Sequence, residues 1–161
     1  MSTFYDACAQ VEIDEYRNYE KALGALKEAG KYMAKSKQPL KESKILQIKK
    51  KISIVEQYLS AKKLLPSNTD EALAICKDLL DRNDIEDAIR AGDVFATLVE
   101  FFYEQRRAQN AFELIEKMRQ RRIPLFYFLD KKVVLAIYKA VGVTAEFDNE
   151  EEPEEGVREE N

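Results

Sequence analysis

The stretch that decides the fold is ILQIKKKISIVEQYL, at residues 45–59. Its large apolar residues recur at spacings of three and four, which places them on one stripe of an α-helix: Ile45, Ile48, Ile52, Val55 and Leu59. Lysines occupy much of the remaining surface. Pro39 precedes the stretch and Pro66 follows it, and proline disfavours helix at the residue before it. The spacing therefore predicts a helix over about residues 40–65, with Ile52 buried.

The same periodicity continues toward the N-terminus. Phe4, Cys8 and Val11 form one apolar stripe, Asn18 interrupts the pattern, and apolar spacing resumes at Tyr19. This arrangement predicts two helices joined by a tight turn.

Downstream, turn and capping residues divide the chain into four further helical segments. Asn68 or Thr69 is a suitable N-cap for the first, and Asn83 or Asp84 for the second. The third begins after Arg107, and we expect Pro124 to end it. The last covers about residues 130–141 and stops at Gly142, a typical C-terminal cap.

Three of the expected helices open with a similar element: Tyr19-Glu-Lys-Ala22, Thr69-Asp-Glu-Ala72 and Ala108-Gln-Asn-Ala111. An apolar residue follows each final alanine after four positions and again after seven. This pattern resembles the second helix of the tetratricopeptide repeat, although the alanines are not at its usual spacing of about 34 residues. We predict an all-α fold of antiparallel helix pairs, stacked as a TPR-like α-solenoid of about seven helices. An ordinary helical bundle would produce the same periodicities.

Composition agrees with long helices. The 161 residues are 45% hydrophobic and 35% charged, with only five glycines and four prolines. The formal net charge of −4 is unevenly spread, because residues 146–161 contain nine acidic residues against Arg158 alone. A segment this acidic, with few apolar residues, cannot bury enough surface to offset its ordering entropy. We expect a helical-repeat domain at residues 1–145 and an acidic, disordered tail at residues 146–161 that folding does not require.

The residue inventory argues against an enzyme. The chain has no histidine, which removes the usual general base at neutral pH and the commonest metal ligand. Its two cysteines, Cys8 and Cys76, form no C-x-x-C pair, so they cannot complete a structural zinc site. The glycines form no phosphate-binding loop, and the acidic run at residues 150–155 lacks the glycine of an EF-hand. We expect no catalytic residues, no metal and no cofactor.

Cysteine usage and hydropathy indicate the compartment. Both cysteines lie in apolar-periodic segments, where free thiols behave as small buried hydrophobic residues in a reducing environment. No apolar run reaches the roughly 20 residues that span a bilayer, and the N-terminus has no signal-peptide pattern. We expect an intracellular segment taken from a longer polypeptide, because the helix pattern begins abruptly at Phe4.

Several longer motifs resemble a known family. They are Tyr5-Asp-Ala-Cys-Ala-Gln-Val-Glu-Ile-Asp-Glu-Tyr16, Asn18-Tyr-Glu-Lys-Ala22 with Ala25-Leu26, and Ile89-Arg90 followed by Gly92-Asp93-Val94 and Leu98-Val99-Glu100. Over about residues 4–122 the chain is similar to the C-terminal helical-repeat region of the intraflagellar transport protein 140 family. The resemblance implies a non-catalytic ciliary scaffold of complex A, located in the cytoplasm and at the ciliary base and axoneme.

Two surfaces are candidates for binding a partner. The first is basic, since residues 27–63 hold eleven lysines against three glutamates. Lys44, Lys51 and Lys62 are 7 and 11 residues apart and so share a stripe. We expect this stripe to be exposed and either simply solvated or in contact with an acidic partner segment or lipid headgroups.

The second candidate surface is Leu125-Phe-Tyr-Phe-Leu129. No single helical face could hide five consecutive large apolar residues. Either the last helix covers Phe126, Tyr127 and Phe128, or these residues form a partner surface.

The resemblance thus implies a scaffold segment that contacts other complex A subunits and a cargo adaptor. The alternative is a basic helical module that binds anionic membrane lipids or nucleic acid. The basic segment lacks the interleaved aromatic residues of nucleic-acid binders, so we expect no nucleic acid and no membrane insertion, with peripheral contact to anionic lipid as an open alternative.

Overall fold

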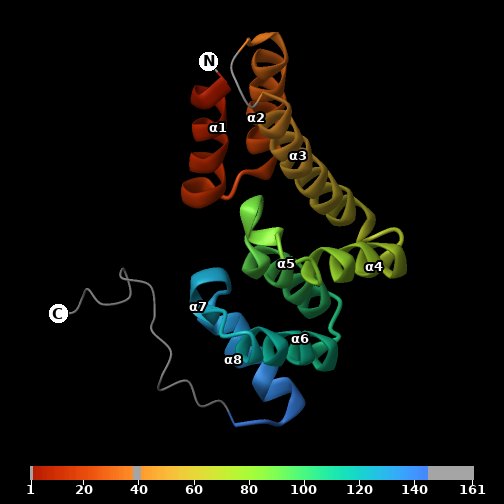
Figure 1. Ribbon diagram of the computed structural model, residues 1–161. Coiled ribbons are helices and arrows are strands. Elements are labelled where there is room, and N and C mark those ends of the chain that lie inside the picture. The colour runs from red at the N-terminus through yellow and green to blue at the C-terminus, as the bar shows by residue number, and fades with distance from the viewer. Residues whose placement is uncertain (1, 38–40, 145–161) are drawn as a thin grey trace, which may run out of the picture. The chain divides into compact units, whose positions relative to one another are not determined.

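A computed structural model describes residues 2–37 and 41–144. Every regular element in these residues is helical (Figure 1), which confirms the all-α prediction. The elements in chain order are α1 (Ser2–Val11), η1 (Glu12–Tyr16), α2 (Tyr19–Lys35), α3 (Lys41–Leu64), α4 (Thr69–Leu80), η2 (Ile85–Asp87), α5 (Ala91–Glu104), α6 (Ala108–Gln120), α7 (Leu125–Phe128) and α8 (Lys131–Val141). The expected tail at residues 146–161 lies outside the described residues.

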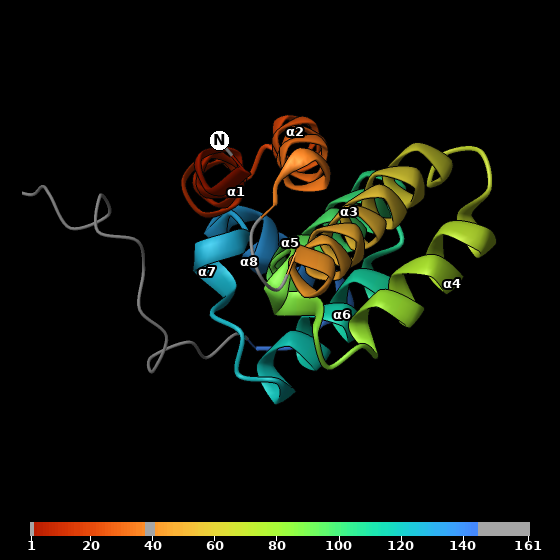
Figure 2. The same ribbon diagram turned by 45° about the horizontal axis from the view of Figure 1, so that its top comes forward.

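The chain divides into two compact units, residues 1–91 and residues 92–161. In the first unit consecutive helices pack against each other: α1 on α2, α2 on α3, and α3 on α4. Figure 2 looks nearly along α1 and α2 and shows them lying side by side, with α3 next to α2. The unit therefore consists of helices packed on their neighbours in sequence, as expected of a helical-repeat array.

The long helix α3 has two buried faces, where the sequence predicted one. Ile48 and Val55 of the predicted stripe are buried, while Ile52 is only half-buried. A second stripe lies on another side of the helix and is also buried: Ile54, Tyr58 and Ala61. The helix needs both stripes because it packs between α2 and α4.

The three repeated elements occupy equivalent positions in α2, α4 and α6. Ala22, Ala72 and Ala111 each have 0% of their surface exposed. The apolar residues four and seven positions later are buried as well: Leu26 and Ala29, Cys76 and Leu79, and Ile115 and Met118. Because alanine carries only a methyl group, the second helix of each pair can approach its neighbours closely at this position. The sequence repeat is therefore also a packing repeat, in which equivalent residues are buried in each of the three helices.

The turns between paired helices also follow a pattern. The Asn18 side chain caps α2 by accepting a hydrogen bond from the Lys21 N–H at 3.1 Å. The Asn68 side chain caps α4 in the same way, accepting from the Glu71 N–H at 3.3 Å. Arg17, directly before the first cap, has the left-handed φ of 52°, and Arg106, in the turn before α6, has a φ of 59°. These residues reverse the chain direction between α1 and α2 and between α5 and α6.

The prediction that Asn83 or Asp84 caps the helix containing Val94 was wrong. Asp84 precedes only the short η2 turn, and its carboxylate instead binds Arg82 at 2.8 Å. The helix α5 begins at Ala91, whose N–H donates to the Glu86 carboxylate at 2.8 Å. The cap therefore comes from an acidic residue five positions upstream.

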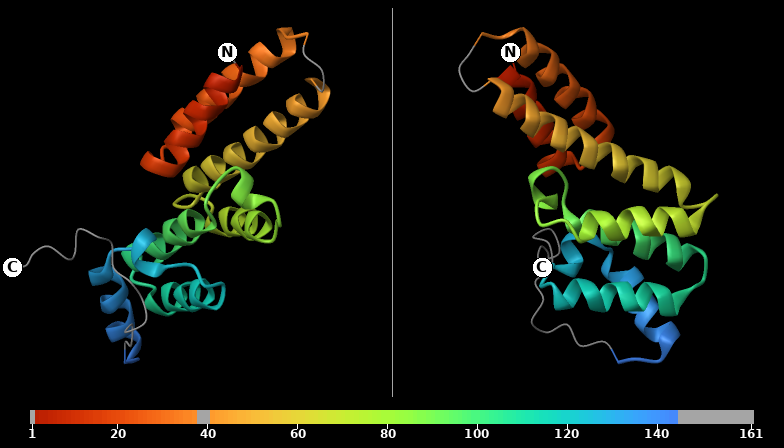
Figure 3. Two further views of the ribbon diagram at one scale, coloured as in Figure 1. Left: turned by 60° about the vertical axis from the view of Figure 1, so that its left-hand side comes forward. Right: turned by 45° about the vertical axis from the view of Figure 1, so that its right-hand side comes forward.

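In the second unit, α7 and α8 both pack against α6, as the right-hand view of Figure 3 shows. The rings of Phe112 and Tyr138 join α6 to α8 edge to face, with centroids 5.1 Å apart. The expectation that Pro124 ends the preceding helix was wrong, since α6 ends at Gln120 and Pro124 is the N-cap of α7. The predicted last helix is confirmed, with Asp130 as its N-cap and Gly142 at φ 77° as its C-cap.

Candidate interaction surfaces

The lysine stripe on α3 is not uniformly exposed. Lys44 and Lys62 are exposed, and the Lys62 ammonium lies 5.4 Å from the centre of the Tyr58 ring. Lys51 is half-buried, and its Nζ lies 3.3 Å from Oδ1 of Asp6 in α1. The expectation of exposure was therefore wrong for Lys51, because this side of α3 faces α1 as well as solvent.

Two hollows lie along this side of α3, and both are lined by Gln47 and Lys51. One, of about 420 Å³, also includes Lys50 and Asp87, and the other, of about 250 Å³, includes Lys44. Asp6 lines the second hollow beside Lys51. The lysines here thus face carboxylates of the same unit, which moderates the positive charge that the sequence suggested.

The aromatic segment divides into buried and exposed residues. Phe126 is only 5% exposed and lies beneath the Lys131 ammonium, which is 5.6 Å from its ring centre. Tyr127 is 57% exposed. Phe128 is half-buried, and its ring lies where a side chain on Gly92 would otherwise be. A short helix thus buries part of the segment and leaves Tyr127 accessible.

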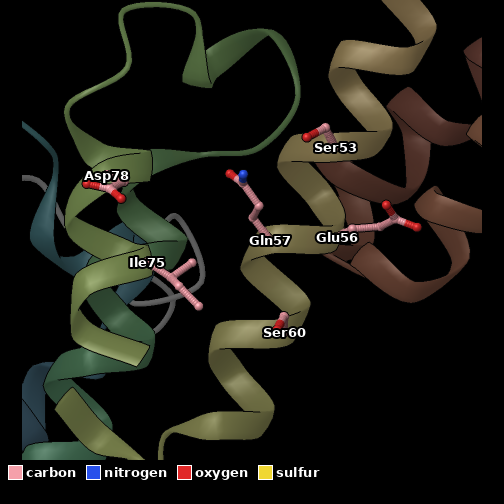
Figure 4. Close-up of a pocket in the computed structure, with 6 residues that line it drawn as sticks. All are labelled: Ser53, Glu56, Gln57, Ser60, Ile75 and Asp78. Carbon is pink, nitrogen blue, oxygen red and sulfur yellow. The ribbon is translucent and has the colours of Figure 1, made fainter. Parts of the chain in front are cut away.

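A third surface, which the sequence reasoning missed, is a groove of about 400 Å³ between α3 and α4. Four residues of α3 and two of α4 line it: Ser53, Glu56, Gln57, Ser60, Ile75 and Asp78. In Figure 4, Gln57 and Ile75 extend into the gap from opposite walls. The sequence does contain a sign of this groove, which is a polar stripe without lysine in an otherwise lysine-rich helix, at positions 53, 56, 57 and 60.

A polar cluster joins the two ends of the first unit. The guanidinium of Arg90 donates to the Asp14 carboxylate in η1, and the backbone N–H of Arg90 donates to the Tyr19 hydroxyl at 3.2 Å. A hydrogen bond from the Gln10 amide, together with Arg90, lowers the pKa of Asp14 below its ordinary value. Both Asp14 and Arg90 lie in motifs that carried the family resemblance, yet their spacing gave no sign of this contact. The widened turn of η1 places Asp14 toward Arg90.

The described residues lack a cluster of metal ligands and bury the thiol of Cys76. In this part of the chain no three His, Cys, Asp or Glu side chains form a group able to hold a metal ion. Burial raises the pKa of the Cys76 thiol to about 11, so it stays protonated and unreactive at neutral pH. None of the helices at residues 2–37 and 41–144 is long and apolar enough to cross a membrane.

The geometry agrees with a comparison to known families. A family model described as the C-terminal TPR domain of intraflagellar transport protein 140 matches residues 1–119. This range includes all three repeated elements and the residues that suggested the resemblance. Because the match covers well over half of the 161 residues, the chain belongs to the family of intraflagellar transport protein 140 C-terminal TPR domains.

Proposed function

We propose that the chain is a non-catalytic scaffold segment of the intraflagellar transport complex A. It acts in the cytoplasm and cilium, in retrograde transport and the trafficking of ciliary membrane proteins. Its exposed helix surfaces contact other complex A subunits and a cargo adaptor. The observation that carries the proposal is the family match over residues 1–119, together with the three helices that repeat one buried register.

The family makes the chain a helical module related to complex A. TPR-type domains are generally non-catalytic and present side chains on stacked helices to a partner. Some polar side chains at the surface are engaged in helix caps and ion pairs, for example Asn18, Asn68 and the Lys27–Glu56 pair. Lys44 and Lys62 on the basic stripe and Tyr127 on α7 remain exposed, and we propose them as partner contacts, with Lys51, Phe126 and Phe128 supporting them.

The test is recovery of complex A subunits from ciliated cells with the tagged full chain, at low and at physiological salt. Lys44→Glu/Lys62→Glu reverses the accessible lysines without disturbing the Lys51–Asp6 pair. A matched control, Lys21→Glu/Lys117→Glu, makes the same change in charge at exposed positions of α2 and α6. Circular dichroism checks that each variant keeps its helicity.

We expect the wild-type chain and the control to recover complex A subunits, and the stripe variant to recover fewer, with the greater loss at low salt because screening weakens charge steering. Tyr127→Ala tests the aromatic contact in the same assay. Failure of the wild-type chain to recover any complex A subunit would contradict the proposal. Salt-sensitive binding to anionic liposomes or oligonucleotides in place of subunits would favour the basic-module alternative.

A further inference from the structure

The groove between α3 and α4 is lined by polar side chains of α3 and, on α4, by one apolar residue, Ile75, and one carboxylate, Asp78. On α3, Ser53 and Ser60 lie seven residues apart, and Gln57 reaches toward α4 between them (Figure 4). On α4, Ile75 is only half-buried and faces the gap, with Asp78 one turn further along the helix. The serines are small, which keeps the groove open where larger side chains would close it.

The carboxylates near the groove differ in whether they are already engaged. Glu56 turns away from α4 in Figure 4, and its carboxylate lies 3.3 Å from the Lys27 ammonium. On α4, Asp81 pairs with Lys77 at 3.2 Å. Asp78, by contrast, is exposed and forms no ion pair with another residue that the structure describes. The groove thus offers the Asp78 carboxylate beside the apolar side chain of Ile75.

We propose that this groove binds an arginine side chain of a partner protein. The apolar stem of an arginine fits against Ile75, and its guanidinium then reaches the Asp78 carboxylate and the Gln57 amide oxygen. The planar guanidinium can donate to both acceptors at once, whereas a lysine ammonium acts as a compact point charge. Serine hydroxyls at either end can accept from the partner's backbone.

The dimensions and surroundings restrict the partner segment further. From Ser53 to Ser60 the groove runs about 10 Å along the helix, the length of about three extended residues. Lys49 and Lys63 lie one turn beyond these serines on the same side of α3. They repel a run of basic residues and attract acidic ones. The ligand is therefore an arginine flanked by neutral or acidic residues, and not a polybasic segment.

The experiment measures binding of short fluorescent peptides to the full chain by anisotropy. The peptides share glutamate flanks and differ at one central residue, which is arginine, lysine or citrulline, the neutral analogue of arginine. The protein variants are Asp78→Asn and, as a control that changes the neighbouring carboxylate outside the groove, Asp81→Asn. Ser60→Tyr fills the groove from an exposed position, and circular dichroism checks the fold of all three.

We expect the arginine peptide to bind about fivefold to tenfold more tightly than the citrulline peptide, as for a partly exposed charge-assisted hydrogen bond. Asp78→Asn should remove that preference, Ser60→Tyr should abolish binding, and Asp81→Asn should bind like the wild type. Equal affinity for arginine and citrulline, an unchanged preference in Asp78→Asn, or equal affinity for arginine and lysine would each overturn the proposal. Because the probe is a peptide, the result does not depend on recovery of complex A subunits.

Discussion

The Tyr19 hydroxyl accepts a hydrogen bond from the backbone N–H of Arg90, 71 residues further along the chain, at 3.2 Å. Tyr19 begins α2 and is 2% exposed, and its ring packs edge to face against Tyr58 of α3, with centroids 5.1 Å apart. One tyrosine therefore connects α2, α3 and the segment that follows η2. This buried ring and its hydroxyl thus hold three parts of the first unit together.

The first prediction tests this connection. Tyr19→Phe keeps the ring packing but leaves the Arg90 N–H without its acceptor, so we expect the free energy of unfolding to fall by about 1 kcal/mol. Tyr16→Phe is the matched control, because Tyr16 is 70% exposed and its hydroxyl should be dispensable. Urea denaturation followed by circular dichroism measures both. Equal stability of the two variants would show that the hydrogen bond makes no net contribution to the free energy of unfolding.

The second prediction concerns the small residue of the packing repeat. Ala72 is fully buried in α4, whereas Ala74, two residues later, is exposed. Ala72→Leu forces extra methylenes into a closely packed contact and should destabilise the first unit by about 1 to 3 kcal/mol. Ala74→Leu should change the stability by less than about 0.5 kcal/mol. Thermal melts of the two leucine variants distinguish packing from helix propensity, since both changes alter propensity equally.

The third prediction tests the second buried stripe of α3. Ile54 is 1% exposed and Leu46 is 56% exposed on the same helix. Truncating Ile54 to alanine removes buried methylenes and leaves a cavity, at a cost of about 2 to 5 kcal/mol, while Leu46→Ala should be nearly neutral. Denaturant titration of both variants provides the measurement. A small effect at Ile54 would mean that α3 packs through the Ile48 stripe alone.

Local patterns and long-range contacts differed in how well the sequence predicted them. The alanine register in α2, α4 and α6 was visible because it depends on spacing within one helix. The second buried stripe of α3 was missed because the prediction assumed one apolar face per helix. Ile54 and Tyr58 belong to a second face, which a helix packed against two neighbours needs. The Asp14–Arg90 contact joins residues 76 positions apart and depends on the π-helical η1 turn, for which no local spacing rule exists.

For the candidate surfaces, too, the sequence predicted the pattern within one helix but not the contacts between helices. Spacing predicted Lys44, Lys51 and Lys62 on one side of a helix, and all three lie in α3. Whether a lysine on that side meets solvent or a carboxylate depends on the neighbouring helix, and Asp6 of α1 pairs with Lys51. The α3–α4 groove depends equally on two helices, so the sequence could show only the polar stripe of one wall.

The fourth prediction concerns alkaline pH. Burial, together with its hydrogen bond to Glu116, raises the pKa of Tyr138 from 10.0 to about 12. The folded state therefore holds this proton more tightly than the unfolded state, so stability is fully present below about pH 10 and falls as pH rises toward 12. Tyrosine NMR titration should show Tyr138 ionising well above the ordinary tyrosine pKa of 10.0. In Tyr138→Phe the stability at neutral pH should be lower, and its decline between about pH 10 and 12 should be smaller.

The last prediction links the aromatic segment to α5. A Cβ added at Gly92 would lie far inside contact distance of the Phe128 ring. Alanine normally stabilises a helix over glycine by about 1 kcal/mol, but here the ring would have to move. We therefore expect Gly92→Ala to lower the melting temperature of the chain.

The double variant decides the cause of that loss. In a Phe128→Ala background the space is open, so Gly92→Ala should raise the melting temperature, and its effect should change sign between the two backgrounds. The two single variants, the double variant and the wild type form the complete cycle, measured by thermal denaturation. If Gly92→Ala has the same effect with and without the Phe128 ring, the ring does not occupy this position in solution. Phe128 would then join Tyr127 as an accessible residue for a partner.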